Sequence, residues 1–139
     1  MLPFEFTVPG KPVSHQTRNR AKLADWSRFV RTWASLHWGL KMPVGGAVKL
    51  TVTYFHEGAE ILLDNDNMLK PIQDSMNGVI YVDDRQVTDT VIRKASIDDP
   101  FHVRGSSMVL LEAFARGEPF VHIVVEHAPS HEELLGVVP

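Results

Sequence analysis

The sequence contains no cysteine, so the chain can form neither a disulfide framework nor a thiolate metal site. It also lacks any apolar run approaching the roughly 20 residues that a membrane-spanning helix requires. Its first residues, Met-Leu-Pro-Phe-Glu-Phe, lack the basic segment and the long apolar segment of a secretory signal peptide. We therefore expect a cytoplasmic protein, in a reducing compartment, with no membrane partner.

The composition is that of one folded domain, and its charge is unevenly distributed. With 139 residues, of which 44% are hydrophobic and 22% charged, the chain can build one core, and we expect a single domain over residues 1–139 with a frayed tail at 129–139. Residues 1–41 carry a net charge of +5, whereas residues 42–139 carry −8. This asymmetry suits phosphate neutralisation by one part and metal binding by another, although on charge alone a solvated basic helix face is the simpler interpretation.

The spacing of apolar residues predicts the secondary structure. Alternation with a period of two predicts strands at 4–8, 48–55, 86–97 and 120–126. Spacings of three or four predict helices at 21–37, 67–76 and 108–116, with Asn65 or Asp66 as the N-cap of the second helix. A short extended run is expected at 79–82. Together these elements predict an α+β (α/β) fold, with a mixed sheet of about four strands packed with two main helices.

Two apolar runs lead directly into clustered acidic residues. Ile61-Leu62-Leu63 precedes Asp64 and Asp66, with Lys70 four residues later, and the run at 79–82 precedes Asp83-Asp84. We expect the two runs to lie side by side and to bring their carboxylates together. Carboxylates this dense repel one another unless a cation lies between them, and their oxygens suit a hard cation such as Mg²⁺ or Mn²⁺. Such an ion can activate water and stabilise a phosphodiester, while Lys70 neutralises the phosphate.

The acidic residues must also be weighed against structural roles and against different kinds of metal site. An EF-hand is excluded, because Met68 stands at its fifth position, Leu69 at its glycine position and Ser75 at its twelfth. Any one of the acids alone more often caps a helix or serves a turn than binds a metal. The seven histidines form no H-E-x-x-H or similar pair, so zinc binding is not expected.

The motif Asp64-x-Asp66-Asn67-x-x-Lys70-x-x-x-Asp74, followed by Gly78-x-x-x-Val82-Asp83-Asp84-x-x-Val87 and then Lys94, resembles a known family. It is similar to the RusA-type endodeoxyribonucleases, the Holliday junction resolvases often carried by prophages, over about residues 61–97. The resemblance implies a RusA-like fold and a homodimer that depends on Mg²⁺, with Mn²⁺ as a substitute. It also implies the cutting of four-way DNA junctions by paired nicks in recombination and repair.

The resemblance also assigns roles to particular residues. By motif position, the catalytic set is Asp64, Asp66, Asp84 and Lys70, and the metal ligands are Asp64, Asp66 and Asp84 with Asp83 as an auxiliary acid. The sequence departs from the family pattern at Asn65, where an apolar residue is common, and at 98–119, which has the character of an insertion. Candidate contacts to the DNA backbone are Lys11, Arg18, Arg20, Arg93 and Lys94.

Two other functions remain open at this point. One is a non-catalytic, metal-stabilised nucleic-acid-binding module, in which the acids hold a structural Ca²⁺ or cap a helix. The other is an enzyme that acts on nucleotides or another phosphoester rather than on DNA.

Overall fold

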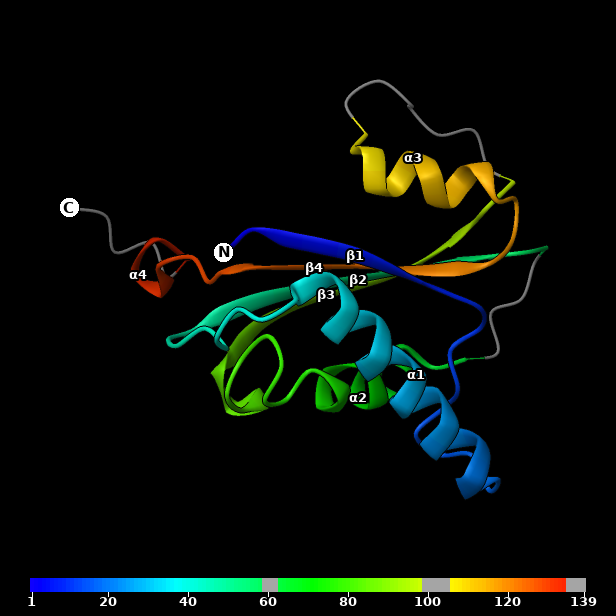
Figure 1. Cartoon of the computed structure of the whole chain (residues 1–139), viewed down its shortest axis with the longest axis horizontal. Helices are drawn as coiled ribbons and strands as arrows, with labels where there is room; N and C mark the ends of the chain where they lie inside the picture. The colour runs from blue at the N-terminus through cyan, green and yellow to red at the C-terminus, as the bar shows by residue number, and fades with distance from the viewer. Residues whose placement is uncertain (59–62, 99–105, 135–139) are drawn as a thin grey trace.

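A mixed four-stranded sheet forms the centre of the computed structural model, which describes residues 1–58, 63–98 and 106–134 (Figure 1). Its strands lie in the order β1-β4-β2-β3. Strand β4 is antiparallel to β1 and β2, whereas β2 and β3 are parallel. The expected mixed α+β sheet is thus confirmed. The bounds are β1 (Phe4–Pro9), β2 (Val48–His56), β3 (Val87–Ser96) and β4 (Phe120–His127).

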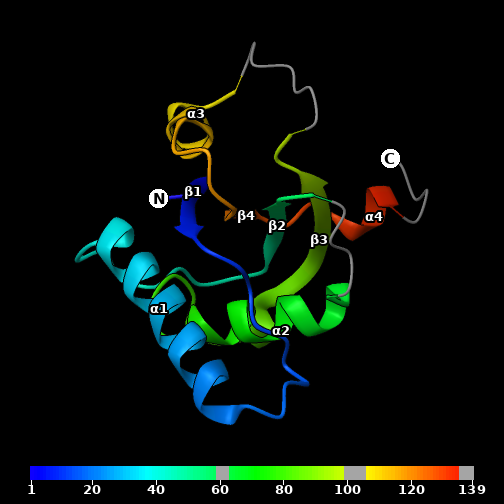
Figure 2. The ribbon, with the colours of Figure 1, turned by 90° about the vertical axis from the view of Figure 1, so that its right-hand side faces the viewer.

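Helices cover both faces of this sheet. Helices α1 (Arg20–Trp38) and α2 (Asn65–Ser75) pack on one face, and α3 (Met108–Ala115) lies over the other, so the molecule has three layers (Figure 2). A short α4 (His131–Leu134) follows β4, and a single 3₁₀ turn, η1 (Asp84–Gln86), leads into β3. These bounds confirm the helices expected near 21–37, 67–76 and 108–116.

Helix α1 forms where its sequence pattern predicts. The side chain of Asn19 accepts a hydrogen bond from the Lys22 N–H at 3.0 Å and so caps the first turn. At the other end, Gly39 has a φ of 74°, which favours glycine and ends the helix after Trp38. The buried stripe of the helix consists of Leu23, Trp26, Val30, Ala34 and Trp38.

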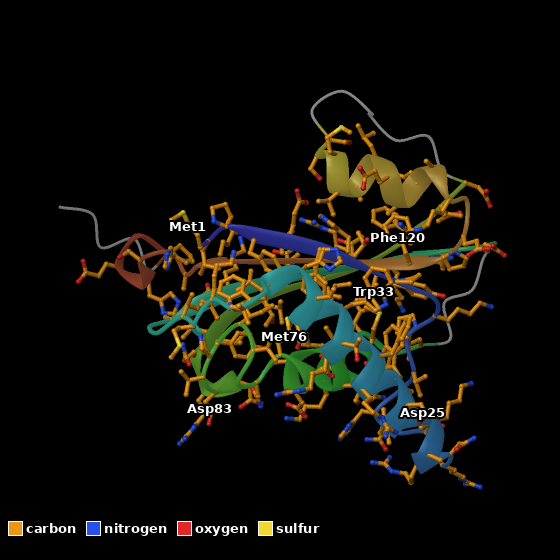
Figure 3. The ribbon with its side chains drawn as sticks, in the orientation of Figure 1. Met1, Asp25, Trp33, Met76, Asp83 and Phe120 are labelled. Atoms are coloured by element: carbon orange, nitrogen blue, oxygen red, sulfur yellow. The ribbon has the colours of Figure 1, made fainter. Side chains whose placement is uncertain are left out.

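Two hydrophobic clusters hold the layers together. The larger cluster lies between the sheet and helices α1 and α2, and it includes the fully buried Ile72 and Met76. The smaller cluster lies under α3, where the rings of Phe55 and Phe120 stack and Phe114 meets both edge-to-face, with ring centroids 4.9–5.3 Å apart. Met76 and Phe120 consequently lie on opposite sides of the sheet (Figure 3).

The connection from β2 to β3 sets the geometry of the acidic segment. Because these strands are parallel, the chain must return along the sheet between them, and α2 makes this return. The start of α2 therefore lies near the ends of β2 and β3, where Lys94 Nζ donates to the Leu63 carbonyl at 2.6 Å. The end of α2 lies near the start of β3. Asp64 therefore lies at the start of α2, whereas Asp84 lies in the segment that follows the end of α2.

Three local expectations change in the structure. Asp64, rather than Asn65 or Asp66, is the N-cap of α2. Residues 79–82 do not form an extended strand but a turn, in which Tyr81 makes isolated bridges to Val44 and Asn77. The runs at 61–63 and 79–82 were expected to lie side by side, but Leu63 lies near the end of β3, where Lys94 bonds its carbonyl, whereas 79–82 leads to the start of β3. Residues 61–62 lie outside the described ranges.

The described residues bear on two further expectations. In the segment expected to be a tail, residues 131–134 form one helical turn, and His131 Nε2 lies 2.9 Å from Asp89 Oδ1. Across 1–58, 63–98 and 106–134, no helix has the length and apolar character needed to cross a membrane.

The anchoring of α2 can be tested by replacing Ile72 with alanine. Ile72 is fully buried in the larger cluster, so Ile72→Ala should lower the free energy of unfolding by about 2–5 kcal/mol. The matched control is Leu36→Ala on α1, where the side chain is 71% exposed and the change should stay within about 0.5 kcal/mol. Urea unfolding followed by circular dichroism measures both values, and equal losses in the two variants would contradict this description of the core.

Candidate active site

The exposed face of α2 carries a charged stripe. Asp66, Lys70 and Asp74 are four residues apart, so they lie one above another on the same face of the helix. Asp64 precedes them as the N-cap, and its Oδ1 accepts the Asp66 N–H at 2.9 Å. The opposite face packs into the core through Met68, Pro71, Ile72 and Ser75. The burial of that face fixes the direction in which the stripe points.

Lys70 joins α2 to the segment that follows it. Its Nζ lies 3.0 Å from Asp74 Oδ1 and 3.6 Å from Asp84 Oδ2, in the first residue of η1. The hydrogen bond with Asp74 is the main reason that the pKa of Lys70 is raised, which stabilises the protonated form that a lysine already has at neutral pH. The Lys70 side chain is 48% exposed and can still reach a ligand in solvent.

The adjacent acids Asp83 and Asp84 have opposite electrostatic environments. Asp83 caps η1 by accepting the Arg85 N–H at 2.9 Å and the Arg85 guanidinium at 3.2 Å, and these bonds lower its pKa to about 2. The pKa of Asp84 is instead raised, first by hydrogen bonding with the carboxyl group of Asp74 and then with that of Asp83, despite the nearby Lys70. Negative charge at Asp84 is therefore only partly compensated in the protein alone.

Side-chain hydrogen bonds to the backbone hold this acidic segment in place. Gln86 Oε1 accepts the N–H groups of Val82 and Asp83 at 2.8 and 3.0 Å. Its Nε2 donates to the carbonyls of Val44 and Gly46, both at 2.9 Å. Together with the cap from Asp83, Gln86 completes a capping box that fixes the backbone beside Asp84.

Tyr81 ties the turn at 79–82 to α2. The residue is fully buried, and its hydroxyl donates to the Gln73 carbonyl at 2.6 Å. Burial raises the Tyr81 pKa, and the negative charges of Asp84 and Asp74 raise it further. The phenol therefore stays neutral and keeps its proton for this bond.

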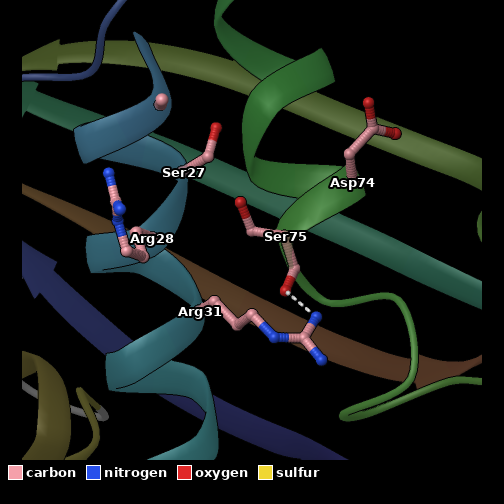
Figure 4. A pocket seen from close by; sticks show the side chains of 6 residues that line it. Ser27, Arg28, Arg31, Asp74 and Ser75 are labelled. Carbon is pink, nitrogen blue, oxygen red and sulfur yellow. Dashed lines mark hydrogen bonds between the residues drawn. The ribbon is translucent and has the colours of Figure 1, made fainter. Parts of the chain in front are cut away.

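Helix α1 supports the end of α2. Arg31 Nη1 donates to the carbonyls of Ser75 and Asn77 at 3.4 and 2.7 Å, which satisfies acceptors at the end of α2 (Figure 4). Next to it, a cavity of about 440 Å³ opens between α1 and α2. Its lining is Ala24, Ser27, Arg28, Arg31, Asp74 and Ser75. Asp74 thus lies where this cavity adjoins the charged stripe.

The structure brings some of the expected catalytic residues together. Lys70 and Asp84 are in contact, whereas Asp64 and Asp66 lie at the first turn of α2 and Asp84 lies beside its later turns. In the described parts of the single chain, no group of three or more His, Cys, Asp or Glu residues is arranged to hold a metal. The donor atoms are nevertheless carboxylate oxygens, the type that Mg²⁺ prefers, so their chemistry fits the ion.

The basic residues expected to contact DNA fall into two groups. Arg20 Nη1 donates to the carbonyls of His15 and Thr17 at 2.9 and 3.2 Å, and Lys94 is bonded to Leu63, so both organise neighbouring loops. Arg18, Arg93 and Lys11 have exposed side chains.

The loop before α1 lies against the start of α2. The His15 N–H donates to the Asn67 carbonyl at 2.9 Å, which brings residues 14–16 next to the first turn of the helix. The basic segment that follows, from Arg18 onward, is therefore on the same side of the sheet as α2, the helix that carries the charged stripe (Figure 2).

Comparison with known families now identifies the chain's relatives. The family described as "Endodeoxyribonuclease RusA" matches residues 8–104, well over half of the 139 residues. The chain belongs to the RusA endodeoxyribonuclease family. Its members are hydrolases that resolve Holliday junctions, and branched DNA is therefore the substrate class of this RusA chain. No curated protein matches the sequence.

The RusA match covers the whole candidate site but not the whole sheet. It extends from the end of β1 through α1, β2, α2, η1 and β3. It ends at residue 104, before α3 and before β4, which lies between β1 and β2 in the sheet. All residues of the candidate site thus lie within the RusA match.

Several supporting residues of this RusA site were not predicted from the sequence. Gln86 could have been found, because Asp83-x-x-Gln86 is the spacing of a capping box. The link from Lys70 to Asp74 was visible only as a shared helix face. The contacts of Arg31 and Tyr81 carry no sequence signal, since their partners are backbone carbonyls brought close by the fold.

The difference in pKa between the adjacent carboxyl groups of Asp83 and Asp84 is directly measurable. In metal-free protein, Asp83 should titrate near pH 2 and Asp84 above the ordinary aspartate value of about 4. Because the folded-state pKa of Asp83 is lowered, its contribution to stability is present above the unfolded-state pKa and is lost as the pH falls through about 2. NMR titration of the side-chain carboxyl carbons measures both groups.

Arg85→Met provides the control for this titration. Without the guanidinium, the pKa of Asp83 should rise toward its ordinary value, while the backbone cap still holds part of the shift. Titration of Asp83 and Asp84 together at the ordinary aspartate value in the unmodified protein would show that the capping geometry is wrong.

Proposed function

We propose that this RusA-family chain is a Mg²⁺-dependent endodeoxyribonuclease that cuts four-way DNA junctions as a homodimer during recombination and repair. The observation that carries the proposal is the solvent-accessible Lys70, which is placed between Asp74 and Asp84 within the family-matched segment. A protonated amine beside carboxylates is a suitable arrangement for a reaction at a phosphodiester, because the negative charge that develops on the phosphate oxygens must be offset.

The metal would be held by Asp64, Asp66 and Asp84, with Asp83 as an auxiliary acid. All four offer carboxylate oxygens, and the raised pKa of Asp84 reflects negative charge that Lys70 alone does not neutralise. A bound Mg²⁺, or Mn²⁺ in its place, supplies a Lewis acid that polarises the phosphodiester and acidifies water. Within the described part of one chain these acids are not gathered into a three-ligand group, so ion and substrate must complete the arrangement.

Lys70 acts on the phosphate itself in this proposal. Its ammonium group lies on the exposed face of α2 and is protonated at neutral pH, as a lysine ordinarily is, and Asp74 and Asp84 raise its pKa further. It can therefore donate hydrogen bonds to a non-bridging phosphate oxygen and offset the charge that develops there. The fixed backbone on both sides, held by Gln86 and Tyr81, limits the movement of the acids during this step.

The DNA would approach along the basic side of the charged stripe. Lys11 and Arg18 are the exposed candidates for phosphate contacts on this side, whereas Arg20 and Lys94 act mainly by holding loops. Arg93, the neighbour of Lys94 on β3, is exposed on the face of the sheet that α3 covers, so a contact from Arg93 would need DNA that reaches around the sheet edge. Two opposed nicks in one junction require two sites related by a twofold axis, which is the reason for proposing a homodimer.

Replacing Asp66 tests the catalytic assignment. Asp66→Asn should reduce Mg²⁺-dependent nicking of a synthetic four-way junction at least about 100-fold, because an oxygen ligand loses its charge. The helix should still form, since Asp64 is the N-cap. Junction affinity, measured by gel shift without metal, should be retained. Asp25→Asn is the matched control, because this exposed aspartate forms its ion pair with Arg28 at the start of α1 (Figure 3).

A non-catalytic nucleic-acid-binding module is the second candidate. It is favoured by the capping roles of Asp64 and Asp83, which account for both acids without a metal. In that case the unmodified protein would bind junctions and leave them intact in Mg²⁺ and Mn²⁺. If Asp66→Asn instead nicked junctions at the full rate, the protein would be a nuclease, but Asp66 would not be one of its catalytic residues.

Salt dependence tests the phosphate contacts. If Arg18 contacts one phosphate, Arg18→Gln should reduce the slope of log affinity against log salt by about 1 and weaken binding for all junction sequences. Arg116→Gln, an exposed arginine at the end of α3 on the opposite face of the sheet, should leave the slope unchanged. Fluorescence anisotropy across a salt series measures both, and a flat dependence in the unmodified protein would argue against a polyanionic partner.

A further inference from the structure

We propose that Asp74 is a positioning residue that holds the Lys70 ammonium group in place for the reaction. This inference rests on the proposed function, because it assigns the support of Lys70 in that same site. Asp74 Oδ1 is the nearer of the two carboxylate partners of Lys70, at 3.0 Å against 3.6 Å for Asp84.

Lys70 needs such a partner because its side chain is long and half-exposed. A lysine has four flexible side-chain bonds, and fixing them carries a large cost in conformational entropy. Asp74 lies one helical turn after Lys70 on the same rigid helix, so it confines the ammonium group without any movement of other elements. Asp84 lies on a separate element, η1, and its carboxyl group is hydrogen-bonded with those of Asp74 and Asp83.

The position of Asp74 is unfavourable for the helix itself. Asp74 is the penultimate residue of α2, where the negative end of the helix dipole disfavours a carboxylate, and the last turn contains no basic residue. A lysine that precedes its acidic partner by four residues is also the weaker order for a helical pair. Both side chains are more than 40% exposed, so the ion pair contributes little to stability.

The backbone under Asp74 is nevertheless fixed from several directions. The neighbouring Gln73 carbonyl accepts the buried Tyr81 hydroxyl, and the Ser75 carbonyl accepts a hydrogen bond from Arg31. Ser75 Oγ donates to the Pro71 carbonyl at 2.5 Å. A charge placed against the helix dipole on so well supported a backbone is typical of a residue that serves a site rather than stability.

The first test replaces Asp74 with its uncharged isostere. Asp74→Asn should lower the single-turnover rate of junction nicking about 10- to 100-fold, because Lys70 is no longer confined. Junction affinity without metal should be unchanged, and the melting temperature should be unchanged or higher. Asp25→Asn removes another exposed, helix-borne partner of a basic side chain and should alter none of the three values. Nicking by Asp74→Asn within twofold of the unmodified rate would overturn the proposal.

A double variant separates positioning from direct action. If Asp74 acts through Lys70, then Lys70→Met should lose at least as much activity as Asp74→Asn, and Lys70→Met/Asp74→Asn should lose no more than Lys70→Met alone. A larger loss in Asp74→Asn than in Lys70→Met would show that Asp74 acts on its own, for example on a metal, and would overturn the positioning role.

A measurement without DNA or metal distinguishes failure of this inference from failure of the proposed function. NMR of the lysine side chains, with the Lys70 signal assigned from its loss in Lys70→Met, should show an ordered Lys70 in the unmodified protein. In Asp74→Asn the signal should become as mobile as that of the exposed Lys22, with a smaller effect in Asp84→Asn. A mobile Lys70 in the unmodified protein would refute the contact even if the protein cuts junctions, whereas an ordered Lys70 without nicking would refute the nuclease.

Discussion

Repulsion among neighbouring carboxylates is the constraint on which this site depends. Asp74, Asp83 and Asp84 come from two elements, and their mutual hydrogen bonding raises the pKa of Asp84 even though Lys70 lies close by. Like charges at this separation would move apart if the chain allowed it. They stay together because Gln86 and Tyr81 fix the backbone of the segment that carries Asp83 and Asp84. The fold thus holds these carboxyl groups close together, and a bound cation can relieve the repulsion between their negative charges.

Stability and function are supplied by different parts of the molecule. The ion pairs of Lys70 are exposed and contribute little to the free energy of unfolding, which comes mainly from the cluster between the sheet and helices α1 and α2. One helix serves both purposes, because the buried face of α2 includes Ile72 while its opposite face carries the charged stripe. Changes on the two faces should therefore have separable effects.

The sequence predicted the elements well where the hydrophobic period was long. Helix α1 and strands β2 and β4 were found because each carries a regular series of buried residues, whereas β3, whose residues are intermediate or exposed, was found from the alternation of its residue types. The run at 79–82 was misinterpreted as a strand because it is a buried turn. Ile80 and Tyr81 are large hydrophobic residues that fill the core there, and a turn leaves no periodic pattern in the sequence. The cap of α2 was placed wrongly because Asp64, Asn65 and Asp66 are all good N-caps.

The sequence predicted which residues belong to the site better than it predicted how they are placed in space. Motif spacing identified Lys70 and Asp84, and the fold brings these two into contact. Spacing along the chain does not reveal which end of a helix a later segment meets, and the parallel β2-α2-β3 connection brings Asp84 to the later turns of α2. The assignment of Asp64, Asp66, Asp83 and Asp84 to a metal stays a prediction for the same reason.

The place of β4 in the sheet has a consequence for the order in which the chain can fold. Within the described residues, strand β1 pairs with β4 alone, so that Phe4 lies opposite Val125, and β2 also needs β4 along one edge. During synthesis, β1 must wait for residues 120–127 to emerge, more than 100 residues later, before it finds its partner. The β2-α2-β3 unit can form earlier from nearby residues, but its open edge remains a template for incorrect pairing until β4 arrives. Nascent chains should thus be most prone to aggregate in the interval just before β4 leaves the ribosome.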